Sequence, residues 1–215
     1  MLPFDLIIFD CDGVLVDSEL ISNRILAGML CDLGLNVTLE DVFERFVGHS
    51  MAHCLVMIAD ALGSEVPAHF EAEFHARIDL ALAEQLQPVP GVVDVLRRLS
   101  LPVCVASNGE PDKIRSSLGR TGLLERFEGR LFSAAHVARG KPAPDLFLHA
   151  ATVMGAAPER CVVIEDTAVG VTAGRAAGMT VLGYAGRTPA ARLSAAGANV
   201  VFSDMAELPG LIARD

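Results

Sequence analysis

The chain has 215 residues and a formal net charge of −10, with 52% hydrophobic and only 5% aromatic residues. This length suffices for one large domain, or a main domain with a smaller insert, around a buried core. The acidic balance argues against nucleic acid or an anionic membrane as a partner, and no uncharged run approaches the roughly 20 residues of a membrane-spanning helix. An N-terminus without a basic stretch and five cysteines without a CxxC pair predict a reducing, cytoplasmic location.

An apolar segment of strand type near the N-terminus ends at two carboxylates, Asp10 and Asp12, followed by Gly13. Two acids at the end of a buried strand are costly to keep close unless a cation or a reaction requires them. A strand followed by an ordinary Asp/Gly turn explains the same residues. This segment alone leaves both interpretations open.

The next part of the chain, residues 16–87, has helical periodicity and no strand signal. Four helices are predicted, over residues 17–34, 39–47, 50–62 and 67–86. Thr38, with acidic residues directly after it, has the pattern of a helix start. A proline-rich stretch at residues 87–91 ends this region, which predicts an all-helical insertion after the first strand.

Beyond this stretch, helical and strand patterns alternate. Strands are predicted over residues 102–106, 130–133, 161–164, 180–184 and 199–201. Helices are predicted over residues 92–99, 113–122, 143–154, 168–177 and 189–196, with another at the C-terminal end. Apolar strands alternating with helices indicate an α/β fold with a parallel, Rossmann-like sheet covered on both faces. We therefore expect a core of residues 1–15 and 88–215 and a helical domain of residues 16–87.

Polar side chains gather where strands of this sheet end, which is where sites form in open parallel sheets. The groups concerned are Asp10 with Asp12, Ser107 with Asn108, Glu165 with Asp166, and Lys141 in a loop beside Pro142. They offer acids for a hard cation, a hydroxyl donor and an ammonium, a combination that suits phosphoryl transfer. Each group taken alone is also explained by an ordinary turn, loop or helix cap. Their joint occurrence in this order favours a site.

Four ordered motifs carry a family resemblance that covers essentially the whole chain. They are Asp10-x-Asp12-Gly13-Val14, Ser107-Asn108-Gly109, Lys141-Pro142-x-Pro144-Asp145 and Glu165-Asp166-Thr167-x-x-Gly170. With them the chain resembles the haloacid dehalogenase-superfamily phosphatases that have a helical cap inserted after the first strand.

This resemblance implies a hydrolase that forms an aspartyl-phosphate on Asp10. Asp12 would protonate the leaving oxygen and then act as the base for water. Ser107 and Lys141 would hold the transferring phosphoryl oxygens. Asn108 and Gly109, in the same loop as Ser107, are expected to bind substrate.

The resemblance also implies a Mg²⁺ cofactor, although Mn²⁺ suits the same oxygen ligands. The ion would bind the Asp10 carboxylate, the backbone carbonyl of Asp12, and Asp166. Glu165 would be a ligand or would lie just behind the ligands. Because Asp12 provides an acid/base that dehalogenation does not use, the resemblance disfavours a dehalogenase.

The substrate is expected to be a small phosphorylated sugar or sugar acid. Asp17-Ser18-Glu19 and the run over residues 129–151 resemble 6-phosphogluconate and other sugar-phosphate phosphatases. The enzymatic alternative is a β-phosphoglucomutase, which would need a cap His and a cap Arg at about Ser22 and Met51. The alternative to an enzyme is a non-catalytic protein of the same fold that binds a phosphometabolite.

Residues of the helical segment are expected to set specificity, and the protein is expected to be a monomer or homodimer. The candidates are Asn23, Arg24, His49, Ser50, His53 and Arg77. For each of these residues, a solvent-exposed position on a helix is at least as good an explanation as contact with substrate. Arg24 is the favoured substrate contact, and His49 is a second candidate for this role.

Overall fold

The computed structural model describes residues 4–47 and 51–213. Its contacts divide the chain into two compact units. One unit comprises the residues up to Asp17 together with those from Gln87 onward, and the other comprises Ser18–Leu86. Within the described residues, no helix has the length and apolar character needed to cross a membrane.

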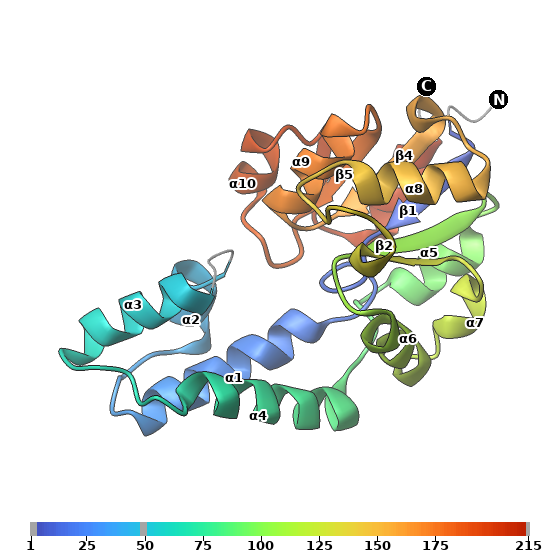
Figure 1. Ribbon diagram of the computed structural model, residues 1–215. Coiled ribbons are helices and arrows are strands. Elements are labelled where there is room, and N and C mark those ends of the chain that lie inside the picture. Colours follow the sequence, from blue (N-terminus) through green and yellow to red (C-terminus); the bar gives the residue numbers. More distant parts are fainter. Residues whose placement is uncertain (1–3, 48–50, 214–215) are drawn as a thin grey trace. The chain divides into compact units, whose positions relative to one another are not determined.

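The first unit is built on a six-stranded sheet in the order β3-β2-β1-β4-β5-β6 (Figure 1). Its strands are β1 (Leu6–Phe9), β2 (Val103–Ser107), β3 (Leu131–Ser133), β4 (Cys161–Glu165), β5 (Thr180–Tyr184) and β6 (Val200–Phe202). Each pair of neighbouring strands is parallel. β1, β2 and β4 are buried along their whole length, as expected for a sheet covered on both faces. The predicted α/β class is confirmed.

Helices cover both faces of this sheet. They are α5 (Val92–Arg98), α6 (Pro111–Arg120), α7 (Leu124–Phe127), α8 (Asp145–Met154), α9 (Ala168–Ala176), α10 (Ala190–Ala195) and α11 (Leu208–Ile212). α8, α9 and α10 pack on the face that contains Leu6 and Ile8, whereas Phe127 of α7 contacts Phe9 on the opposite face. α6 begins two residues earlier than its apolar pattern indicates, because Pro111 suits the first turn of a helix.

The second unit consists of α1 (Ser18–Asp32), α2 (Leu39–Arg45), α3 (Met51–Leu62) and α4 (Phe70–Gln85). No strand occurs in its described parts, residues 18–47 and 51–86. α2 has the expected start: the Thr38 hydroxyl accepts the N–H of Asp41, and the Asp41 carboxylate accepts the N–H of Thr38. An apolar cluster shared by the four helices gives this unit its own core.

The register of the central strands brings two acids to the same level. β1 lies between β2 and β4, where the strand order reverses, and ligands bind at such points in open parallel sheets. Phe9 pairs with Ile164, so Asp10 and Glu165 follow side by side. Because side chains alternate along a strand, both carboxylates project on the face that α8 covers.

Candidate active site

A buried lysine joins the two acids that the register brings together. Lys141, in the loop before α8, donates from Nζ to Asp10 Oδ1 at 2.8 Å and to Glu165 Oε1 at 2.6 Å. Only 4% of its side chain is exposed, and the ammonium lies 4.9 Å from the centre of the Phe147 ring. Burial by itself would lower the pKa of Lys141, but the two carboxylates outweigh burial and raise it. Lys141 is therefore a fixed positive charge.

The Asp10 carboxyl lies in a site that favours an additional cation. Burial is the main influence and, with the nearby Glu165 charge, raises the pKa of Asp10 to about 7, although Lys141 opposes this. One ammonium thus compensates only part of the negative charge of these buried carboxyl groups. A divalent cation would make the ionised form of Asp10 favourable.

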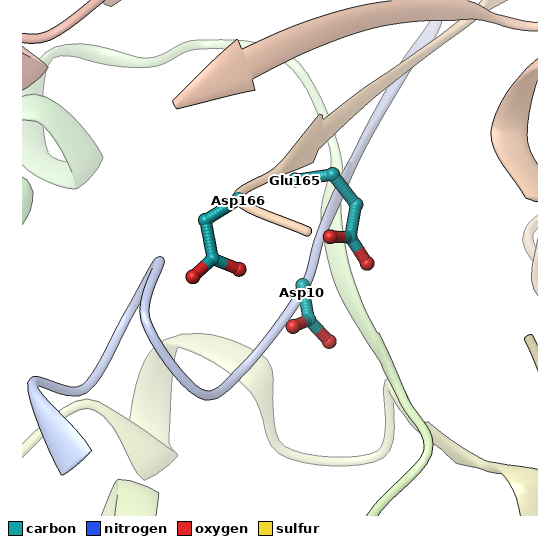
Figure 2. A group of neighbouring side chains, drawn as sticks. All are labelled: Asp10, Glu165 and Asp166. Carbon is teal, nitrogen blue, oxygen red and sulfur yellow. The ribbon is translucent and has the colours of Figure 1, made fainter. Parts of the chain in front are cut away.

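A third buried acid, Asp166, completes a group that could hold such a cation. One oxygen each from Asp10, Glu165 and Asp166 lies within 4.8 Å of the others, and all three residues are buried. Figure 2 shows the side chains of the three acids close to one another. Carboxylate oxygens are the ligands that Mg²⁺ and Ca²⁺ prefer. The chemistry of these donors therefore fits the Mg²⁺ that the family resemblance implies.

Glu165 differs from the other two acids because the protein already uses both of its oxygens. Oε1 accepts from Lys141, while Oε2 accepts from the N–H of Thr167 at 3.0 Å and from the Thr167 hydroxyl at 2.9 Å. Gly170 leaves room for this carboxylate, since a methyl group at that position would overlap it. These contacts favour a place for Glu165 behind the metal ligands, as an anchor for Lys141.

Gly13 gives Asp166 the space that it occupies. The backbone of Gly13 has φ +76°, and a Cβ there would overlap the Asp166 carboxylate. We expect Gly13→Ala to weaken Mg²⁺ binding at least about 10-fold by displacing this carboxylate, with the backbone strain costing about 1 kcal/mol of stability. Calorimetric titration and thermal unfolding measure the two effects.

Gly178→Ala is the matched control for this prediction. Gly178 has φ +75°, and apart from its two chain neighbours no described atom lies within 4 Å of its added Cβ, so it reports backbone strain alone. Equal Mg²⁺ affinities in the two variants would contradict the role given to Gly13.

Asp12, the second aspartate of the first motif, also pairs with a lysine. Lys113 of α6 donates from Nζ to Asp12 Oδ2 at 3.0 Å. Lys113 belongs to none of the four sequence motifs. The available signal was composition, since Lys113 and Lys141 are the two lysines of the chain. The structure therefore places one lysine against each aspartate of the motif.

Ser107 is the last residue of β2, and Asn108 follows it in the loop at the same edge of the sheet. Ser107 is buried, and its Oγ accepts the N–H of Gly109, which leaves the hydroxyl hydrogen able to donate to a ligand. The Asn108 side chain instead holds the loop of Lys141: Nδ2 donates to the Lys141 carbonyl at 3.0 Å, and Oδ1 accepts the Lys141 N–H at 2.9 Å. Contact of Asn108 or Gly109 with substrate stays a prediction.

This paired contact predicts a measurable effect of Asn108. Asn108→Ala should remove two hydrogen bonds to the Lys141 backbone, costing about 1–3 kcal/mol in the free energy of unfolding. It should also lower kcat more than it changes KM, because Lys141 loses its position. Thermal unfolding and steady-state kinetics test this. A variant with unchanged kcat and a raised KM would point to substrate contact instead.

The candidates from the helical unit lie apart from this cluster in the sequence and have varied surroundings. Arg24 is exposed on α1. Asn23 donates to the carbonyl of Glu19, and Arg77 pairs with Glu73 and Asp32. His53 lies on α3. His49 and Ser50 lie outside the described residues. Substrate contact by Arg24 and His49 stays a prediction.

Known proteins resemble this chain over most of its length. The family model described as haloacid dehalogenase-like hydrolase matches residues 4–178. A 6-phosphogluconate phosphatase from Escherichia coli is 34% identical over 183 residues, which are 84% of this chain and 82% of that protein.

Two crystal structures extend the resemblance to three dimensions. A conserved haloacid dehalogenase-like protein from Agrobacterium tumefaciens is 38% identical with a TM-score of 0.91, and the match covers 98% of both chains. A HAD family hydrolase from Deinococcus radiodurans, crystallised with bound phosphate and sodium, is 34% identical with a TM-score of 0.89. That match covers 99% of this chain and 96% of the other.

Proposed function

The chain belongs to the haloacid dehalogenase-like hydrolases and is a phosphatase of that type, and we propose that it hydrolyses a small phosphorylated sugar or sugar acid through an aspartyl-phosphate. The observation that carries the proposal is the buried group of Asp10, Lys141 and Asp166. It joins a carboxylate nucleophile, a fixed ammonium and a cation-binding acid within one unit of the protein.

The chemistry would proceed in two displacements at phosphorus. An oxygen of Asp10 attacks the phosphorus and forms a new P–O bond as the ester P–O bond breaks. The leaving oxygen takes a proton from Asp12. Water then attacks the aspartyl-phosphate at phosphorus and gives its proton to Asp12, and the bond to Asp10 breaks to release inorganic phosphate.

Lys141 and Ser107 would hold the phosphoryl oxygens during both displacements. The Lys141 ammonium lies 2.8 Å from the Asp10 carboxylate, so it lies beside any group that bonds to that oxygen. The Ser107 hydroxyl would donate a hydrogen bond at the end of the neighbouring strand. Fixed donors of this kind need no reorganisation as charge moves between oxygens.

Mg²⁺ would be held by the carboxylates of Asp10 and Asp166 and by the backbone carbonyl of Asp12, while Glu165 positions Lys141. When bound, this ion supplies positive charge to the phosphoryl group and to the nucleophile. The oxygen donors and the raised pKa of Asp10 support this assignment.

The substrate class is supported by the relative named 6-phosphogluconate phosphatase. We infer that the helical unit, Ser18–Leu86, acts as a cap that excludes water and selects the substrate, with hinges near residues 15–16 and 88–91. Arg24 is the favoured specificity residue, and Arg24→Ala should raise KM for some phosphorylated sugars more than for others. Equal KM values for wild type and variant across substrates would remove Arg24 from this role.

The proposal is tested by measuring phosphate release from a panel of sugar phosphates and phosphorylated sugar acids. Release should require added Mg²⁺, stop with a chelator and return with excess Mg²⁺. The panel includes β-glucose 1-phosphate with a catalytic amount of its bisphosphate, so formation of glucose 6-phosphate would identify a mutase. Binding without release from any member would favour a non-catalytic phosphometabolite-binding protein.

A further inference from the structure

The general acid proposed above, Asp12, is held by a residue outside the four motifs. Lys113 donates to Asp12 Oδ2 at 3.0 Å. The two residues are 101 positions apart in the chain, yet both belong to the sheet-containing unit. Their contact is formed within this one unit, between α6 and the loop after β1, and it is present without substrate.

The two lysines of the site have different surroundings. Lys141 is 4% exposed and bridges two carboxylates, whereas Lys113 is 50% exposed. Within the part of the chain that the structure describes, Lys113 forms an ion pair with no carboxylate other than Asp12. The charged or titratable groups around it are Asp12, Cys11 and Asp10. Lys113 thus contacts the second aspartate of the motif, as Lys141 contacts the first.

We propose that Lys113 is the positioning residue of Asp12, an inference that rests on the phosphatase function proposed above. The Asp12 side chain is 31% exposed, and Lys113 contacts one of its two carboxylate oxygens. The bond to Oδ2 fixes the carboxyl plane, so the other oxygen keeps one direction during both displacements. A proton donor displaced by about 1 Å can lose about 100-fold in rate.

Asp12 exchanges a proton in both displacements. The leaving oxygen takes the proton of Asp12 as the ester P–O bond breaks, and Asp12 becomes a carboxylate. Asp12 then accepts a proton from the attacking water, which completes the cycle without any further reactant.

Lys113→Met tests this inference because it keeps the length of the side chain and removes its charge. With an alkyl phosphate such as a sugar phosphate, kcat should fall about 10- to 100-fold. Lys113→Arg keeps a cation and should restore most of that loss. Arg115→Met is the matched control, since it removes a positive charge from the same helix, where Arg115 pairs with Glu128.

Comparing two leaving groups distinguishes a loss of Asp12 positioning from general damage to the active site. p-Nitrophenol leaves without needing a proton, so the pre-steady-state burst with p-nitrophenyl phosphate should keep its rate in Lys113→Met. The later steady-state rate should fall, because hydrolysis of the aspartyl-phosphate still needs Asp12 as a base. In the Asp12→Asn background, adding Lys113→Met should change neither rate.

Two results would overturn the inference. One is a wild-type kcat for Lys113→Met with the sugar phosphate, and the other is an equal loss of the burst rate and the alkyl phosphatase rate in a folded variant. In both cases an active wild type would leave the proposed function standing. A wild type inactive towards both substrates would overturn the proposed function and this inference with it.

Discussion

Asp10→Asn should lower the rate of phosphate release by about 10⁴- to 10⁶-fold, as expected when a covalent nucleophile is removed. Asparagine has the same shape and keeps an oxygen that can accept from Lys141, so the geometry of the site should be preserved. Steady-state assays with the best substrate of the panel measure the loss. Asp94→Asn, at an exposed position of α5, is the control for loss of one carboxylate.

The same variant should be at least as stable as the wild type above pH 7 when Mg²⁺ is absent. The folded protein raises the pKa of Asp10 from 3.8 to about 7, so between these values it binds a proton that the unfolded chain has released. The free energy of unfolding should therefore fall as pH rises through this window in the wild type, and less so in Asp10→Asn. Thermal unfolding at several pH values would detect this. A strongly destabilised Asp10→Asn would mean that its inactivity reflects misfolding.

Lys141→Met should remove activity and also destabilise the fold. Lys141 is the cation between the buried carboxylates of Asp10 and Glu165. Its loss leaves two like charges together in a buried site, which typically costs about 3–5 kcal/mol. Because a bound divalent cation would compensate part of that charge, the loss should be larger without Mg²⁺ than with it.

The matched variant for this prediction is Lys141→Arg. It keeps the positive charge and should recover most of the stability, but its larger planar group should not recover full activity in a site fitted to one ammonium. Chemical denaturation with and without Mg²⁺, together with phosphatase assays, separates the two properties. Stability of Lys141→Met equal to wild type would contradict the account of this buried ion pair.

The fold could be predicted from the sequence largely because its strands are continuous apolar runs with polar ends. The alternation of such strands with helices specifies a parallel sheet, and β1, β2 and β4 form where this pattern indicates. Two helices begin at residues other than the predicted ones. Pro111 begins α6 before its apolar pattern starts, and α4 begins at Phe70, after a turn in which Phe70 donates to the Pro67 carbonyl.

The site could be predicted as a group of residues but not as a set of contacts. Motif order predicted that Asp10, Lys141 and Asp166 share one site, because Asp10 and Asp166 follow strands of the sheet and Lys141 precedes a helix, and the structure brings the three together. The pairing of Asn108 with the Lys141 backbone spans 33 residues and depends on how two loops meet. The pairing of Lys113 with Asp12 depends likewise on the packing of α6. Sequence periodicity carries no information on such contacts.

The most direct test of the central claim is to look for the phosphoryl group on Asp10. A reaction of wild-type protein, Mg²⁺ and the best substrate is stopped with acid within one turnover, and the peptide that contains Asp10 is analysed by mass spectrometry. We predict that this peptide gains one phosphoryl group, which is absent from Asp10→Asn and appears and decays at rates that account for kcat. Turnover without any phosphorylated Asp10 peptide would contradict the aspartyl-phosphate mechanism.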